Sequence, residues 1–178
     1  MRWLAVLLAL GACQRETRMD DARSEGKSGA TLPAASQARV WDAAVREAFD
    51  VGPGLVLLLS PTHLPRGAGY DGGTPVPDSL RAALVATGVV SGTCAPARES
   101  AQRAPRCDAD RSGYVVRGSE IFRGAGDTLQ LYLASEVYAA VNGPGQQPFT
   151  FEMAYKLVPR DGDRWQVVAE GRVRGSKQ

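Results

Sequence analysis

In Tyr155-Lys156-Leu157-Val158-Pro159-Arg160-Asp161-Gly162-Asp163-Arg164-Trp165-Gln166-Val167-Val168, apolar and polar residues alternate on both sides of the turn sequence Asp161-Gly162-Asp163. Alternation with a period of two is typical of a β-strand with one buried face, and Asp-Gly is typical of a tight turn. The stretch therefore predicts a β-hairpin. A hairpin is marginal alone, so further elements must cover its apolar face.

The length of the loop decides which residues face each other across this hairpin. A two-residue loop on Asp161-Gly162 would set Met153 opposite Glu170 and place charge on the apolar face. A three-residue loop pairs residues of matching character: Leu157 with Val167, Tyr155 with Ala169, and Glu152 with Arg172 on the other face. Because a slip by one residue turns every side chain to the wrong face, we predict the three-residue loop.

Further strands and two helices are predicted upstream of the hairpin. Apolar residues at helical spacing predict helices over 37–49 and from Asp78 to Gly88. The apolar run 55–60 is typical of a strand buried on both faces, and alternation covers four later segments: 114–122, 129–138, 149–158 and 165–173. We expect an α+β fold, with a small, mainly antiparallel sheet of about four to five strands and both short helices packed on one face.

Length and composition limit the protein to one ordinary domain. The chain has 178 residues, of which 44% are hydrophobic and 22% are charged, values close to the globular average. Its net charge of +2 comes from 21 basic and 19 acidic residues. Such a balance creates no strong field that would favour nucleic acid or an acidic partner, so we expect no nucleic-acid binding.

The N-terminus carries the most specific motif. Arg2 precedes a short apolar segment from Leu4 to Leu10, and the sequence Leu10-Gly11-Ala12-Cys13 follows. This order resembles the lipobox of bacterial lipoproteins, which implies cleavage before Cys13, a thioether-linked diacylglycerol on its sulfur and usually an acylated amine. Several acyl chains anchor a protein to a membrane stably. By the same resemblance, Gln14 favours the outer membrane, since an aspartate there is typical of inner-membrane retention.

The lipobox divides the chain into three expected parts. Residues 1–12 form the signal peptide. Residues 13–37 contain the lipidated cysteine and a polar segment that buries too little apolar surface to fold, so we expect a flexible tether. Residues 38–178 form a single globular domain. The expected location is the bacterial cell envelope, on the outer membrane and facing the periplasm or the cell surface.

Cys94 and Cys107 remain once Cys13 is assigned to the anchor. In an exported chain, two cysteines with twelve residues between them predict one local disulfide. A redox thiol is less favoured, because the sequence has no Cys-x-x-Cys motif. The pair is therefore expected to pin the base of the polar loop 95–106.

Asp108, Asp110 and Ser112, followed by Gly113, resemble the first half of an EF-hand calcium loop. The bidentate glutamate of that motif would fall on Ser119, and the nearest glutamate comes one residue late. A polar turn before the strand at 114 explains the same residues, since two carboxylates alone hold calcium weakly. Calcium bound by Asp108, Asp110 and Ser112 is kept as an alternative, and no other cofactor is expected.

Few residues offer catalytic chemistry. His63 is the single histidine and is expected at the surface or in a loop, and no nucleophile elbow surrounds Ser60 or Ser79. The stretch Gly67-Ala68-Gly69-Tyr70-Asp71-Gly72 fits the glycine pattern of dinucleotide-binding loops, but prolines follow where a helix would have to begin. An enzyme would need a pocket between helix and sheet in which His63 meets carboxylates such as Asp71.

The order of predicted elements from Val40-Trp41 to the closing hairpin resembles a group of small uncharacterised exported bacterial proteins. That group has no known activity and implies none here. We therefore expect a lipid-anchored, non-enzymatic domain that binds or scaffolds an envelope protein or a small ligand. The alternative is a small-ligand-binding protein or a hydrolytic enzyme that uses a pocket between helix and sheet.

Overall fold

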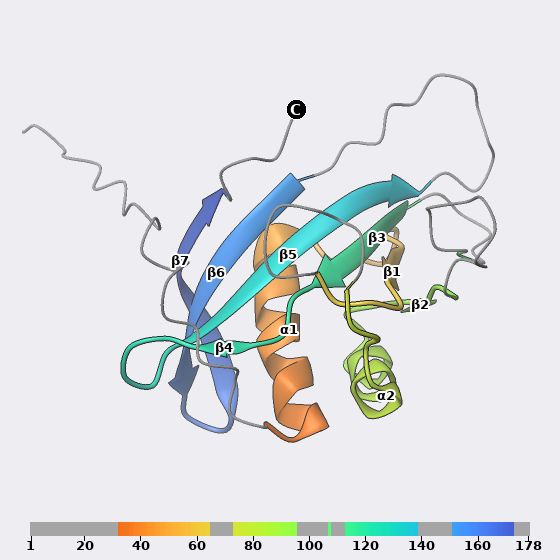
Figure 1. Ribbon diagram of the computed structural model, residues 1–178. Helices are drawn as coiled ribbons and strands as arrows, with labels where there is room; N and C mark the ends of the chain where they lie inside the picture. The colour runs from red at the N-terminus through yellow and green to blue at the C-terminus, as the bar shows by residue number, and fades with distance from the viewer. Residues whose placement is uncertain (1–31, 65–72, 96–106, 108–112, 139–150, 173–178) are drawn as a thin grey trace, which may run out of the picture.

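The computed structural model describes residues 32–64, 73–95, 107, 113–138 and 151–172. Within these residues, a mixed β-sheet carries both helices on one face (Figure 1). The elements in chain order are α1 (Ala34–Ala48), β1 (Leu57–Leu59), α2 (Asp78–Ala86), β2 (Gly92–Thr93), β3 (Gly113–Gly118), β4 (Phe122–Arg123), β5 (Leu129–Tyr138), β6 (Phe151–Arg160) and β7 (Arg164–Arg172). The predicted α+β class agrees with this arrangement.

The sheet is larger than predicted and partly parallel. Its seven strands lie in the order β2-β1-β3-β5-β6-β7, with β4 paired to β5. β1 runs parallel to both β2 and β3, and the other pairs are antiparallel. The prediction of a small, mainly antiparallel sheet of four to five strands was wrong in these respects, because β2 and β4 have two residues each and give no alternation to detect.

β1 lies inside the sheet, and all three of its residues are buried, as the apolar run 55–60 predicts. Leu57 and Leu59 belong to the main core, whereas Leu58 belongs to a second cluster that contains Cys94 and Val115. A strand covered on both faces needs apolar residues at every position, which explains the missing alternation. Helix α2 lies in the crossover from β1 to β2 that parallel pairing requires.

Both helices form where their spacing predicts, with small differences at the ends. α1 starts at Ala34 instead of residue 37, because alanine favours helix and Pro33 fits ahead of the first turn. α2 starts at Asp78 as predicted. Gly88 has a φ of 73°, a left-handed conformation that glycine adopts without strain, and it ends α2 as predicted. Neither helix is long and apolar enough to cross a membrane in the part of the chain that the structure describes.

The main core lies between the sheet and the two helices. Trp41 of α1, Leu80 of α2, and Leu131, Leu133 and Leu157 of the sheet are each at most 1% exposed. The apolar face that the alternation predicts for the hairpin is covered, because these residues belong to the core or pack against it: Met153, Tyr155, Leu157, Trp165 and Val167. The side chain of Phe151 lies outside the described residues.

The loop of the closing hairpin is the predicted one. Arg160 pairs with Arg164 and Leu157 pairs with Val167, which leaves the three residues 161–163 in the loop. Gly162 and Asp163 adopt φ values of 72° and 61°. Arg39 of α1 forms an ion pair with Asp163, and both side chains are about half exposed. Such a pair contributes at most about 1 kcal/mol, so it positions the loop more than it stabilises the fold.

A β-bulge changes the register in the second half of the hairpin, between Lys156 and Leu157. The observed pairs are Tyr155 with Glu170 and Met153 with Arg172, so the predicted pairs of Tyr155 with Ala169 and of Glu152 with Arg172 are wrong. The extra residue lies in β7, which ends the described sheet, and edge strands often carry bulges that oppose pairing with another chain. Because of the bulge, Glu170 and Arg172 of β7 lie on the helix-facing side of the sheet, opposite Tyr155 and Met153.

Tyr155 lies next to one of these charges. Burial, together with the smaller effect of the nearby carboxylates of Glu170 and of Glu47 in α1, raises the pKa of its hydroxyl to about 12. Tyr155 therefore remains neutral at physiological pH, and the core beneath α1 receives no phenolate charge.

The contact of Trp41 with Gly118 provides a test of the packing. A Cβ at Gly118 would collide with the six-membered ring of Trp41, whereas a Cβ at Gly52 meets no heavy atom within 4 Å. We predict that Gly118→Ala lowers the free energy of unfolding by about 1–3 kcal/mol because the core is overpacked. The matched control, Gly52→Ala, should change it by about 0.5 kcal/mol or less. Urea unfolding of both variants checks this, and equal midpoints would contradict the described contact.

Candidate functional site

The carboxyl ends of β1, β2 and β3 meet at one edge of the sheet, because the three strands run parallel. Binding sites commonly lie at such ends where the connections of neighbouring strands lead to opposite sides. β1 meets this condition. The chain leads from β1 to β2 on one side of it, and the next strand, β3, lies on the other side of β1. We call residues 60–64, 94 and 117–120 the parallel-strand end and take it as the candidate site.

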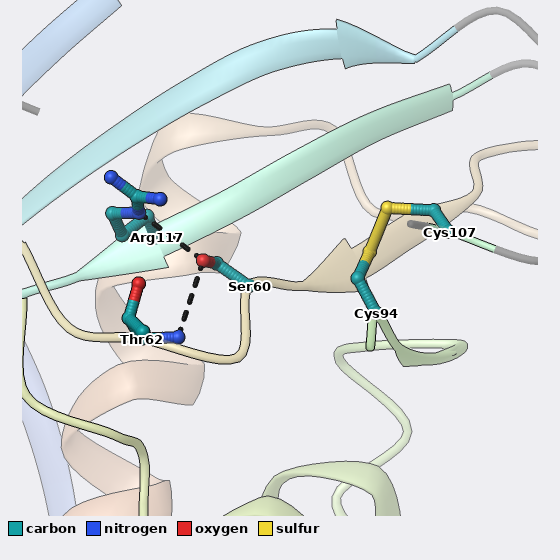
Figure 2. Close-up of a disulfide and its surroundings, with 5 residues drawn as sticks. All are labelled: Ser60, Thr62, Cys94, Cys107 and Arg117. Carbon is teal, nitrogen blue, oxygen red and sulfur yellow. Dashed lines mark hydrogen bonds between the residues drawn. A yellow bond between two sulfur atoms is a disulfide. The ribbon is translucent and has the colours of Figure 1, made fainter. Parts of the chain in front are cut away.

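Ser60 occupies the first position after β1 and is fully buried. Its Oγ accepts a hydrogen bond of 3.1 Å from Arg117 Nε and a longer one of 3.4 Å from the Thr62 amide (Figure 2). Arg117 lies on the sheet face opposite the helices, since its register partner is Ala134 and the alternate residues Leu131 and Leu133 face the core. Ser60 thus orients an arginine at the surface of the sheet.

His63 lies in a loop, as one of the two predicted alternatives has it, but it is buried, with only 5% of its surface exposed, so its placement at the surface was wrong. Its Nδ1 lies 3.1 Å from the carbonyl oxygen of Gly118, and its ring centroid lies 6.1 Å from that of Trp41. Burial lowers the pKa of His63, although the Gly118 carbonyl and the Glu120 carboxylate act in the opposite direction. The imidazole is therefore neutral at pH 7.

These positions do not assemble a catalytic triad among the described residues. Ser60 accepts hydrogen bonds from Arg117 and Thr62, and His63 contacts the backbone of Gly118, so no hydrogen bond joins Ser60 to His63 within that part of the chain. Ser79 begins a different region, in the first turn of α2. Asp71 and the glycine-rich stretch 67–72 lie outside the described residues.

The predicted disulfide between Cys94 and Cys107 is present. It lies beside the Ser60–Arg117 contact, at the edge of the sheet formed by β1 and β2 (Figure 2). Cys94 packs with Leu58 and Val115 in a small cluster on the sheet face opposite the helices, and Val56 and Cys107 flank it. The disulfide therefore covers apolar side chains that neither helix reaches.

The remaining predicted site residues cannot be placed. Cys13, Asp108, Asp110 and Ser112 lie outside the described residues, so lipidation and the calcium alternative stay predictions. In the described ranges, no group of three or more histidine, cysteine, aspartate or glutamate side chains is arranged to hold a metal ion.

A second feature is the sheet face opposite the helices, which we call the open face. Arg117, Ala134 and Glu152 form a row across β3, β5 and β6, with the small alanine between the two charged residues. Ala134 is only 2% exposed and Ala154 7%, although both lie on this face. Phe122 and Tyr132 pack edge to face nearby, with ring centroids 6.0 Å apart. The open face thus carries aromatic rings and side chains of both positive and negative charge, with small buried alanines between them.

This face also has a signal in the sequence, because polar, aromatic or small residues occupy its alternate positions along the period-two strands: Gln130, Tyr132, Ala134, Ala154 and Lys156. The contact of Arg117 with Ser60 left no such signal, because it joins residues far apart in sequence.

Comparisons with known proteins found no match: no family model, no curated protein and no solved structure matches this chain.

The disulfide should stabilise the parallel-strand end measurably. Its cysteines are 13 residues apart in sequence, and closing a loop of that size stabilises the folded state by about 3 kcal/mol. We predict a loss of about that size when Cys94 and Cys107 are both replaced by alanine, measured by urea unfolding. Reduction of the unaltered protein serves as the control and should produce a similar loss. An unchanged midpoint after reduction would show that the bond contributes nothing to folding.

Proposed function

We propose that this protein is a lipid-anchored domain of the bacterial cell envelope that binds a partner protein through its open face and has no catalytic role. The anchor is proposed from Leu10-Gly11-Ala12-Cys13, and the outer membrane from the residue after it. The disulfide of Cys94 with Cys107 supports export, because such bonds persist in oxidising compartments.

The observation that carries the binding proposal is the difference between the two faces of the sheet. On the helix-facing side, the space between helices and sheet is filled, since Trp41, Leu59, Leu131 and Leu157 are at most 1% exposed. This packing gives little support to an enzyme with a pocket between helix and sheet. By contrast, neither described helix packs on the open face (Figure 1), where the side chains include Arg117, Tyr132 and Lys156.

The residue types on the open face suit contact with a protein. Arginine and tyrosine are enriched where protein interfaces hold most of their binding energy, and Arg117 and Tyr132 are both half-buried there. Their own contacts, with Ser60 and with Phe122, restrict their conformations before a partner arrives. Side chains that are already ordered lose less entropy on binding.

The anchor is tested by the intact mass of the full-length protein made in an exporting bacterium. We expect a chain that starts at Cys13 and carries a diacylglyceryl or triacyl group, with a gain of two hydrogens when the disulfide is reduced. The Cys13→Ser variant is the control and should stay unlipidated and leave the membrane fraction. An unlipidated mass for the unaltered chain would refute the anchor.

The open face is tested by placing a photoreactive amino acid at Lys156 of the lipidated protein in the living cell. Lys156 lies on the open face opposite Gln130, whereas Val85 of α2 is 42% exposed on the helix side and provides the control. We expect one discrete adduct from position 156 and none from position 85. Adducts of equal yield from both positions, or from position 85 alone, would contradict the assignment of the open face.

A further inference from the structure

The backbone of residues 60–64, which we call the latch, connects two parts of the molecule. On one side it is bonded to the end of β3: the Ser60 amide donates to Val116 at 2.8 Å and the Leu64 amide donates to Gly118 at 2.9 Å. On the other side, the His63 amide donates to Thr74 and the Val76 amide donates to Pro61, at 2.8 and 2.9 Å. His63 therefore lies between the end of β3 and the segment of Thr74 to Val76, and backbone hydrogen bonds connect the latch to both.

The contacts of the imidazole identify which nitrogen carries the proton. The carbonyl oxygen of Gly118 can only accept, so the hydrogen bond at 3.1 Å requires a proton on Nδ1. Nε2 is then the nitrogen without a proton in the neutral ring. An added proton in acid goes to Nε2 and places a full positive charge on a ring that is 5% exposed and lies against Trp41.

The surroundings of the ring offer limited compensation for that charge. Of the described residues, Glu120 is the charged group that acts on His63, and its carboxylate also approaches the Thr74 hydroxyl at 3.5 Å. Trp41 of α1 and Thr74 are neutral, and the Trp41 indole Nε1 is buried without a hydrogen-bond partner. The free-energy cost of burying the charged imidazolium exceeds what its attraction to one exposed carboxylate, that of Glu120, returns.

We propose that residues 60–64 form an acid-released latch, in which protonation of His63 at Nε2 frees this segment from the end of β3 while the rest of the sheet stays folded. Release is local because few backbone bonds hold the latch, whereas β5 and β6 are paired along seven register positions. The proposal rests on the geometry of His63 and does not depend on partner binding.

The direction of the pH effect follows from proton uptake. His63 binds a proton more readily when the latch is open, since burial lowers its pKa in the closed state below the ordinary value of 6.5. The closed state is thus fully favoured above pH 6.5 and loses stability as the pH falls below it. Release also breaks the backbone hydrogen bond from Ser60 to Val116. Ser60 then no longer accepts the hydrogen bond that orients Arg117 on the open face.

Amide hydrogen exchange on the full-length protein at pH 7.5 and pH 5, corrected for intrinsic exchange rates, tests the latch. We expect the protection factors of the Ser60, Leu64 and Val76 amides to fall at pH 5, by at most about 30-fold given an ordinary histidine pKa. The Leu131 and Tyr155 amides in the sheet should keep their protection. Equal loss in latch and sheet, or no loss in either, would overturn the proposal.

Two variants separate the role of the charge from that of the packing. His63→Asn retains a donor at the position of Nδ1 and cannot be protonated, so latch protection should become independent of pH. Glu120→Gln removes the carboxylate that stabilises the imidazolium in the closed latch, so protonation should open the latch more readily and the loss of protection in acid should be larger. If His63→Asn fails to fold, this larger loss in Glu120→Gln decides alone. The same pH dependence in either variant as in the unaltered chain would exclude His63 as the trigger.

Discussion

The packing of Trp41 against Gly118 is the contact on which the other features of the molecule depend. Only a residue without a Cβ allows the indole ring to lie so close to the backbone of β3, and this contact sets the distance of α1 from the sheet. The same glycine accepts hydrogen bonds through its carbonyl from Leu64 and His63. The end of β3, the latch and the main core therefore all contact Gly118, so a movement of one of them would displace the others.

How much of the fold can be predicted depends on how local its causes are. Both helices, and the closing hairpin as far as its bulge, follow from patterns within about 15 residues. The bulge could not be predicted, because opposing Leu157 with Val167 satisfies the pattern and nothing nearby indicates an extra residue in β7. The parallel pairing of β1 was also hidden, since its apolar run is compatible with either direction.

The candidate site was harder to predict than the fold for the same reason. The disulfide follows from the spacing of two cysteines, a local property. The hydrogen bond of Arg117 with Ser60 spans 57 residues, and that of His63 with Gly118 spans 55. Both arise from the parallel alignment of β1 with β3, which no local pattern in the sequence indicates. A polar loop such as 60–64 looks exposed in sequence, and only the bonds to β3 and to Thr74 reveal that its histidine is buried.

The two faces of the sheet are stabilised by different means, and this difference leaves one face available for function. The helix-facing side gains its stability from buried area, which constrains nearly every side chain there. At β1 and β3, the open face is stabilised instead by the disulfide over Leu58 and Val115 and by the Ser60–Arg117 contact. A covalent link needs little surface, so the neighbouring positions on β5 and β6 remain free to carry charges and aromatic rings. A sheet face without a helix over it therefore gains stability from a disulfide at its edge, where apolar side chains would otherwise contact water.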